Sequence, residues 1–474
     1  MSREKELVKN TAILSVGKLC TQFVSFLLLP LYTSILTKEE YGVYDVYGTY
    51  ISLLLPLVFL QIEQAVFRFL VDTRGKEQES DELISTAVLF VAAQCVLASV
   101  VYGIARPLIK GPYWIFLLTN TLVTIFSGMM LQLTRGLGDN TTYAVGSFLS
   151  ALTTVTANVV FIALLRLGPT GLFLSYFLGN LLCGIYVFAK KSIYRRVHLS
   201  RFRRGKLKEM MQYGLPLVPN ALSWWVLGAA DKNIVKAVFG VSANGILAVS
   251  TKFSTVYTAF YSIFNMTWME SAALYKDTAD RDAYFSEIID TAFRFLSTVI
   301  LGIIAVMPFV FPLLVNVSFQ EAYNQIPIYM ISSLFYSLIG LFSAVYTAYK
   351  ATKEVAKTSF LAAVINVVID LLLIHRIGLY AASISSAAAY GSMALYRLFD
   401  VQKYIRLRVN WKVWVGIVLM GGVVLVSYYR NDLMWNIVTL AAVCVFAVGI
   451  NRKLLTEMIV QGKKLLSGRE ENQK

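Results

Sequence analysis

Charged residues are scarce in this chain. Only 15% of its 474 residues are Asp, Glu, Lys or Arg, whereas 57% are hydrophobic and the mean hydropathy is +0.63. A soluble globular protein carries about 25% charged residues. Apolar runs of about 20 residues, the length of a transmembrane helix, recur along the whole sequence. The composition therefore predicts an all-α, multi-pass membrane protein.

Cysteine and histidine are also rare. The four cysteines lie singly within apolar runs and form no Cys-x-x-Cys pair, so neither a disulfide framework nor a metal site is indicated. The two histidines, His198 and His375, lie in different regions, and the sequence has no Gly-x-x-x-x-Gly-Lys-Ser/Thr phosphate loop. We therefore expect neither an enzyme nor an ATP-driven pump, and no resident cofactor or metal beyond a transported or coupling ion.

About fourteen apolar runs are long enough to be transmembrane helices, and the first is too long for a cleaved signal peptide. If both termini are cytoplasmic, the cytoplasmic segments hold 32 of the 43 Lys and Arg, and the outer segments hold 8. This bias is typical of a correct topology, since one missed span would invert every later segment. The expected spans are residues 9–35, 41–66, 82–104, 113–134, 141–165, 170–189, 209–230, 242–268, 284–311, 324–349, 354–374, 379–396, 413–429 and 432–451.

The most basic stretch, residues 190–208 (KKSIYRRVHLSRFRRGKLK), separates two long apolar halves. It holds nine Lys and Arg and no acid. In a soluble protein such a stretch indicates nucleic-acid binding, but here it is flanked by membrane spans. It is therefore interpreted as a cytoplasmic linker close to anionic membrane lipids, and no nucleic-acid partner is expected.

Two weak sequence echoes indicate an internal duplication. A polar turn and a glycine precede an apolar run at Gly42 and again at Gly245. An Asn-Val-Val motif at Asn158 recurs at Asn366, each followed by a Gly-Leu pair. The offsets are 203 and 208 for these motifs and 207 for the Gly-Leu pairs, so two related halves of six helices are predicted, as in many transporters. The expected organisation is a bundle over residues 1–190, a linker over 191–208, a bundle over 209–403, and helices 13 and 14 with a basic tail over 404–474.

Two lysines fall within spans and lack a nearby acid in the sequence. Lys18 lies in the first span and Lys252 in the eighth. An ionisable group inside a membrane is costly, so each faces either a water-filled, anion-accepting cavity or an acid from another helix. Arg294 differs, because Asp290 four residues earlier predicts an ion pair within one helix.

Oxygen-bearing side chains form a second set. Asn366 and Asp370 are one helical turn apart and share a face, and Asp231 lies near the end of the seventh span. Carboxylate and amide oxygens suit a small hard cation. The alternative is a surface pair between Asp231 and Lys232, with Asp370 bonded to a neighbouring helix.

Several motifs resemble the bacterial Wzx-type polysaccharide repeat-unit flippases of the multidrug/oligosaccharidyl-lipid/polysaccharide (MOP) superfamily. They are residues 9–42, residues 64–69 (QAVFRF), residues 213–219 (YGLPLVP) and residues 230–232 (ADK). The resemblance covers about residues 5–405. It implies a MATE-like fold with two six-helix bundles around a central cavity, working by alternating access. It also implies a bacterial plasma membrane location, with both termini cytoplasmic.

The cargo that the resemblance implies is an undecaprenyl-diphosphate-linked oligosaccharide, moved from the cytoplasmic to the outer leaflet. Lys18, Lys252 and Arg68 are the expected substrate-binding residues, because a diphosphate needs cations. Asp231, Asn366 and Asp370, with Ser386, resemble the sodium site of some lipid flippases in the superfamily, so coupling to sodium or protons is expected. Expected protein partners are a polysaccharide polymerase and glycosyltransferases.

Two other functions stay open at this point. A cation-coupled multidrug exporter would prefer acids over unpaired lysines in its cavity. A membrane scaffold for polysaccharide assembly would transport nothing itself.

Overall fold

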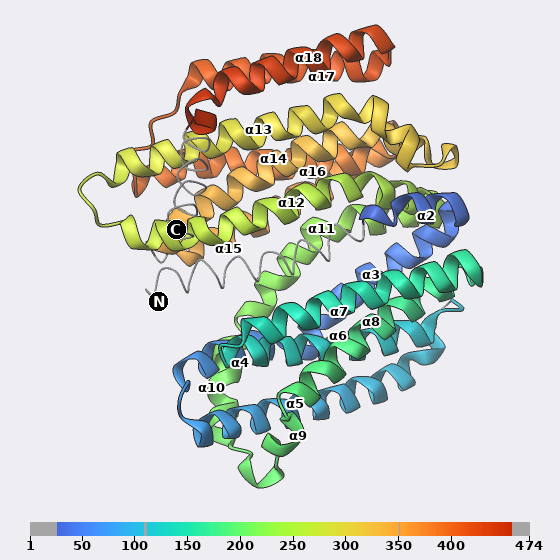
Figure 1. Cartoon of the computed structure of the whole chain (residues 1–474), viewed down its shortest axis with the longest axis vertical. Coiled ribbons are helices and arrows are strands. Elements are labelled where there is room, and N and C mark those ends of the chain that lie inside the picture. Colours follow the sequence, from blue (N-terminus) through green and yellow to red (C-terminus); the bar gives the residue numbers. More distant parts are fainter. Residues whose placement is uncertain (1–25, 109–110, 350, 457–474) are drawn as a thin grey trace, which may run out of the picture. The chain divides into compact units, whose positions relative to one another are not determined.

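The structure is a computed structural model that describes residues 26–108, 111–349 and 351–456 (Figure 1). Within these ranges all regular elements are helical, which confirms the all-α fold class. One π-helical turn, η2 (Val159–Leu164), continues α7, and short 3-10 turns connect other helices. The α-helices are α2 (Leu29–Ile35), α3 (Lys38–Phe59), α4 (Ile62–Asp72), α5 (Glu77–Ala105), α6 (Trp114–Gly136), α7 (Asn140–Asn158), α8 (Pro169–Lys190), α9 (Ile193–Arg196), α10 (Arg204–Gly214), α11 (Leu217–Phe239), α12 (Val241–Tyr275), α13 (Arg281–Leu314), α14 (Glu321–Ala348), α15 (Thr352–Ile377), α16 (Tyr380–Asp400), α17 (Trp411–Arg430) and α18 (Leu433–Ile450).

Ten segments of the described chain are long and apolar enough to cross a membrane. They comprise α3, α5, α6, α7 with η2, α8, α13, α14, α15, α17 and α18. The chain is thus a multi-pass membrane protein. The count of fourteen spans stays a prediction, because most of the first predicted span lies outside the described residues, and the more polar α11, α12 and α16 are not among the ten.

The described chain forms two compact units. The first contains residues up to 259 together with 366–382, and the second contains residues 260–365 together with those from 383 onward. The predicted bundle boundaries at residues 190, 208 and 403 stay a prediction.

The core of the first unit lies where α4, α5 and α6 meet, and α8 packs along both α6 and α7 (Figure 1). The packing of α4 on α6 is close, since a Cβ on Gly136 would lie 2.7 Å from the Cβ of Leu70. Small residues permit such close helix packing where lipid provides no hydrophobic driving force. The most deeply buried core residues are Ile62, Ala65, Val66, Leu70, Ile84, Ala87, Leu133, Val187, Ile193 and Met210.

The second predicted span, residues 41–66, is broken in the structure. Leu60 and Gln61 both adopt left-handed backbone conformations, with φ of 51° and 57°, so α3 ends at Phe59 and α4 begins at Ile62. The end of α10 packs on this break, because a Cβ on Gly214 would lie 2.7 Å from the carbonyl oxygen of Leu60. Glycine is therefore required at that position in the YGLPLVP motif.

The seventh predicted span, residues 209–230, is displaced. The helix α10 ends at Gly214 and α11 begins at Leu217, after Pro216. Proline has no backbone N–H and clashes with the preceding turn, so it begins a helix more readily than it continues one. The predicted span therefore corresponds mainly to α11, which is not among the ten apolar segments, and α10 is a separate polar helix.

The internal repeat is visible in the helix bounds. Together, α3 and α4 run from Lys38 to Asp72, and α12 runs from Val241 to Tyr275. Both ends are displaced by 203 residues, the offset predicted from Gly42 and Gly245. The repeats differ at the break, because α12 is continuous where α3 gives way to α4.

The second unit contains its own helix packing around α13 and α14. The rings of Tyr323 and Tyr428 stack with centroids 4.2 Å apart, and the Tyr428 hydroxyl donates to the Tyr323 carbonyl at 2.7 Å. The Trp268 indole N–H donates to the Leu341 carbonyl at 3.0 Å. Arg397 of α16 is fully buried.

Candidate functional site

Lys232 of α11 forms an ion pair with Asp45 of α3. The ammonium nitrogen lies 3.0 Å from the carboxylate, and both side chains are 19% exposed. The pair joins two helices that lie far apart in the sequence. Lys232 is therefore bound to Asp45, whereas the sequence left open a surface pair with its neighbour Asp231.

Asp45 is also held by Asn244 at the start of α12. The Asn244 side-chain amide donates to the Asp45 carboxylate at 3.1 Å and to the Gly42 carbonyl at 3.3 Å. This contact requires α12 to approach α3 closely. Gly42 and Gly245 allow it, because a Cβ on either residue would overlap a backbone carbonyl of the opposite helix.

Lys252 lies two turns further along α12 and is half-buried. The charged groups that act on it are Asp45 and Lys232. Within the described ranges no carboxylate forms an ion pair with Lys252, so its charge is not matched by an acid of its own. Lys18, the other lysine predicted to bind substrate, lies outside the described residues.

A third lysine, Lys236, lies one turn after Lys232. Its ammonium group donates to the Tyr50 hydroxyl at 3.1 Å and lies 5.1 Å from the centre of the Tyr50 ring. The Trp225 indole N–H donates to the Thr49 carbonyl at 2.9 Å, which is a further hydrogen bond between α11 and α3.

We call Lys232, Lys236, Lys252 and Asp45 the lysine cluster. It gathers three positive charges and one negative charge on α3, α11 and α12. A site inside membrane helices with excess positive charge favours an anion, because low polarity strengthens electrostatic attraction. Sequence reasoning identified Lys252 but assigned Lys232 and Lys236 to an outer loop. The signal available for them was their spacing of four residues, which places both on one face of α11.

A second group of polar side chains in the first unit consists of residues that the sequence predicted to bind a cation. Asp231 of α11 and Asn366 and Asp370 of α15 are buried, with 5%, 0% and 0% exposure. Asp231 acts electrostatically on Asp370. Neither carboxylate oxygen of Asp370 has a hydrogen-bond partner among the residues that the structure describes.

Orphaned carboxylate oxygens beside a second buried acid form a suitable donor set for a small monovalent cation. Within the same ranges no three His, Cys, Asp or Glu side chains gather as they would around a transition metal. Ser386, predicted to belong to the same site, is buried in the second unit. Its part in the site stays a prediction.

The other predicted cations lie elsewhere. Arg68 is about half exposed and pairs with Asp72 on the same helix, at 2.6 Å. Its role in substrate binding stays a prediction. Arg294 pairs with Asp290 at 3.1 Å, which confirms the predicted ion pair within one helix.

The sequence is similar to that of one curated bacterial protein. A protein of Haemophilus influenzae described as "Lsg locus putative protein 1" is 24% identical over 266 residues. The match covers 55% of this chain and 64% of that protein, so the chain spans less than two thirds of the relative's length.

The fold is similar to those of known membrane transporters. The lipid II flippase MurJ in an inward closed conformation matches with a TM-score of 0.70 and 14% identity, over 94% of this chain and 100% of that chain. A multidrug resistance MATE family transporter of the MOP superfamily, in an inward-facing conformation, matches with a TM-score of 0.67 and 13% identity, over 82% and 98%. Because folds host many functions, these likenesses establish the fold alone. The model of the family described as "Polysaccharide biosynthesis protein" matches residues 7–269, more than half of the sequence, and the chain therefore belongs to this family.

Proposed function

We propose that this protein is a secondary flippase that moves an undecaprenyl-diphosphate-linked oligosaccharide from the cytoplasmic to the outer leaflet. The observation that carries the proposal is the lysine cluster, in which Lys232 pairs with Asp45, Lys252 has no acid of its own among the described residues and Lys236 contacts Tyr50, so that positive charge is in excess. Membership of the polysaccharide biosynthesis protein family and a fold similar to that of a lipid II flippase support it. The expected location is a bacterial plasma membrane with both termini cytoplasmic.

The lysine cluster would neutralise the diphosphate. A diphosphate carries more than one negative charge, and transfer through the membrane interior requires matching cations. Lys252 offers a charge without an acid of its own. Lys232 is held by Asp45 in this conformation and would join the substrate when the phosphates compete with that carboxylate. Lys18 and Arg68 are proposed as additional cations.

The polyprenyl chain can stay in the hydrocarbon layer while the sugar crosses. Only the polar head group then needs a path between the helices. Alternating exposure of the cluster to the two membrane faces would move the head group without ATP, and the energy would come from an ion gradient.

We propose that Asp231, Asn366 and Asp370, with Ser386, hold the coupling ion. A sodium ion or a proton would neutralise two acids that burial otherwise makes costly to charge together. Asp231 and Lys232 are consecutive on α11, so movement of this helix would act on the cation site and the lysine cluster together.

The decisive test is flipping by purified protein in liposomes. The substrate is a fluorescent lipid-linked oligosaccharide diphosphate, and the measured quantity is its rate of appearance on the opposite leaflet. We expect the wild type to accelerate flipping, Lys252→Ala to lose at least about tenfold in rate, and Lys252→Arg to retain most of it, since loss of one charged contact costs 1.5–3 kcal/mol.

Three results would contradict the proposed function, and each would favour a different conclusion. No flipping by folded wild-type protein would favour a scaffold in polysaccharide assembly. Export of cationic drugs without flipping would favour the multidrug exporter. Full flipping by Lys252→Ala would remove the role proposed for the lysine cluster.

A further inference from the structure

The linker between the two sequence halves has a defined shape. We call residues 190–208 the basic linker; it contains α9 and leads into α10. Five of its nine cations form ion pairs with acids of the first unit. The pairs are Arg196–Asp81 at 3.3 Å, Arg201–Asp81 at 2.8 Å, Arg203–Glu82 at 3.0 Å, Lys206–Glu82 at 3.4 Å, and Lys191–Asp139.

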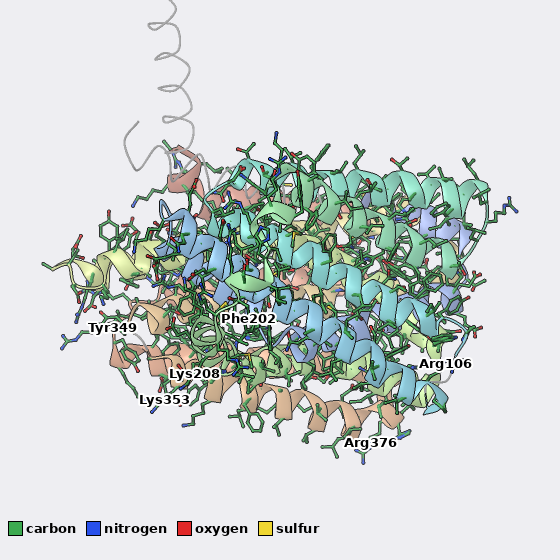
Figure 2. All side chains as sticks on the ribbon, turned by 90° about the horizontal axis from the view of Figure 1, so that it is seen from below. Arg106, Phe202, Lys208, Tyr349, Lys353 and Arg376 are labelled. Carbon is green, nitrogen blue, oxygen red and sulfur yellow. The ribbon has the colours of Figure 1, made fainter. Side chains whose placement is uncertain are left out.

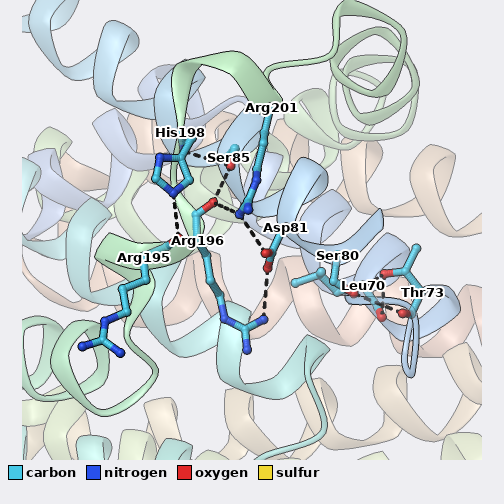
Figure 3. Close-up of polar contacts among 9 residues, drawn as sticks. All are labelled: Leu70, Thr73, Ser80, Asp81, Ser85, Arg195, Arg196, His198 and Arg201. Atoms are coloured by element: carbon cyan, nitrogen blue, oxygen red, sulfur yellow. Dashed lines mark hydrogen bonds and ion pairs between the residues drawn. The ribbon is translucent and has the colours of Figure 1, made fainter. Parts of the chain in front are cut away.

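Hydrogen bonds fix the backbone of the basic linker on α5. The Ser85 hydroxyl donates to the Arg196 carbonyl at 2.8 Å, and the backbone N–H of Arg203 donates to the Thr86 hydroxyl at 3.0 Å. Figure 3 shows the guanidinium groups of Arg196 and Arg201 converging on Asp81. The segment is therefore docked on the start of α5, and its orientation is set.

The other four cations of the basic linker take no part in these ion pairs. Lys190, Arg195, Arg204 and Lys208 are exposed and have no ion pair with any acid that the structure describes. Arg195 illustrates the arrangement, because its guanidinium group points away from Asp81 in Figure 3.

Two apolar side chains lie exposed among these cations. Leu199 is 80% exposed and Tyr194 is 52% exposed, although neighbouring Ile193 is fully buried. The Arg195 guanidinium lies 5.5 Å from the centre of the Tyr194 ring. Tyrosine and arginine with apolar neighbours are typical of the boundary between lipid head groups and hydrocarbon.

The position of the linker fits that boundary. Lys208 lies at one end of the helices of the first unit, and Arg106 lies at the opposite end (Figure 2). The basic linker thus lies at one end of the helices of the first unit, where a membrane-spanning bundle would meet the lipid head groups.

We propose that the basic linker binds anionic phospholipid head groups through Lys190, Arg195, Arg204 and Lys208, with Tyr194 and Leu199 inserted below them. Each cation near an anionic membrane surface adds to the attraction, and the backbone that carries these cations is already ordered. The proposal does not depend on the transported substrate. An acidic protein surface would use the same cations but would leave Leu199 without a role.

The test compares two sets of substitutions, each of which neutralises four cations of the basic linker. The first is Lys190→Gln, Arg195→Gln, Arg204→Gln and Lys208→Gln together. The second, the control, changes Arg196, Arg201, Arg203 and Lys206 to Gln together with Asp81→Asn and Glu82→Gln, so that neither of these partly buried acids is left as an unpaired charge. Leu199→Ser is a third variant that keeps every charge.

Each full-length protein is reconstituted with equal amounts of phosphatidylglycerol and phosphatidylcholine, and the lipids retained after extraction are counted by native mass spectrometry. We expect wild type and the control to enrich phosphatidylglycerol, and the first set to lose at least about tenfold of that enrichment. Leu199→Ser should reduce total retained lipid without changing the head-group preference. High salt should weaken the enrichment, because the cations are exposed.

Two outcomes would overturn the proposal. One is equal phosphatidylglycerol enrichment in the first set and the wild type. The other is absence of enrichment in correctly folded wild type, which would leave the cations to an acidic protein. Since no transport is measured, failure of this test and failure of the proposed flippase activity are separate results.

Discussion

Gly42 of α3 and Gly245 of α12 pack against each other, although 203 residues separate them in the chain. The contact is reciprocal: a Cβ on Gly42 would overlap the Val241 carbonyl oxygen, and a Cβ on Gly245 would overlap the Lys38 carbonyl oxygen. Val241 and Lys38 are themselves related by the same offset. The two repeats thus meet at equivalent points, as expected for duplicated segments related by a local two-fold axis.

Alanine at either glycine should separate α3 from α12. Gly42→Ala and Gly245→Ala are each expected to lower stability by about 1–3 kcal/mol, because the overlapped atoms are backbone carbonyls that cannot rotate away. Thermal unfolding in detergent measures the effect. Gly48→Ala on α3 is the matched control, since a Cβ there has open space and should be neutral or slightly stabilising. Equal unfolding temperatures for all three variants would contradict the contact.

Removing the Asp45 charge should strengthen anion binding. Asp45→Asn keeps the size of the side chain and releases Lys232, so a soluble sugar diphosphate with a short prenyl chain should bind about tenfold more tightly. Lys232→Gln should weaken binding by a similar factor. Titration calorimetry on the purified variants measures both. If Asp45→Asn weakened binding instead, Asp45 would be a positioning residue and not a competitor of the substrate.

Asp370→Asn should abolish a response to the coupling ion. Sodium that binds the folded protein and not the unfolded chain raises its unfolding temperature, and the increase grows with the sodium concentration relative to Kd. We expect a sodium-dependent increase for the wild type, with potassium as the ionic-strength control, and none for Asp370→Asn. Asp45→Asn should keep the increase. A sodium response that survives in Asp370→Asn would place the ion elsewhere.

Burial of Arg397 should make it essential for stability. Its guanidinium donates to the Thr358 hydroxyl at 2.6 Å and to the Val355 carbonyl at 3.2 Å, and it also contacts Ser343. Arg397→Met would remove these hydrogen bonds, each of which is made by a charged donor and contributes about 1.5–3 kcal/mol. Lysine would reach fewer of them, so Arg397→Lys should rescue only part of the loss in unfolding temperature. The exposed Arg195→Met is the control, with little change expected.

The pair between Asp139 and Lys191 should give a pH-dependent contribution. Burial alone would raise the pKa of Asp139, but hydrogen bonds from Lys191 and Thr142 lower it from 3.8 to about 2. A lowered folded-state pKa stabilises the protein above pH 4, and this contribution disappears as the pH falls toward 2. Asp139→Asn keeps a good helix N-cap and loses the charge. The difference in unfolding temperature between wild type and this variant should be constant above pH 4 and shrink below it.

Local sequence patterns predicted much of the fold and part of the candidate site. They missed the contacts between residues that lie far apart in the sequence. The apolar runs located most helices, and the glycine motifs located the repeat. Asp45 and Lys232 could not be paired from sequence, because the nearest acid to Lys232 along the chain is Asp231. Arg397 lies just beyond the predicted span 379–396, so the predicted topology places it in a cytoplasmic segment, and nothing local distinguishes a fully buried arginine from an exposed one.

The two repeats differ in the residues proposed to bind the ion. Asn158 and Asn366 are equivalent, and both are buried. Four residues later the first repeat has Ile162 where the second has Asp370. The proposed ion site therefore depends on residues present in one repeat only, and the duplication alone would have predicted two sites.

The docked linker bears on how the protein acquires its orientation during synthesis. A nascent chain has not yet brought α5 and residues 190–208 together, so all nine cations oppose translocation of that segment. After folding, five of them form ion pairs with Asp81, Glu82 and Asp139, whose three negative charges offset three of the nine positive charges. The charge that decides insertion is thus larger than the charge that the mature protein displays, and removal of a paired cation could misorient the second half without weakening lipid binding.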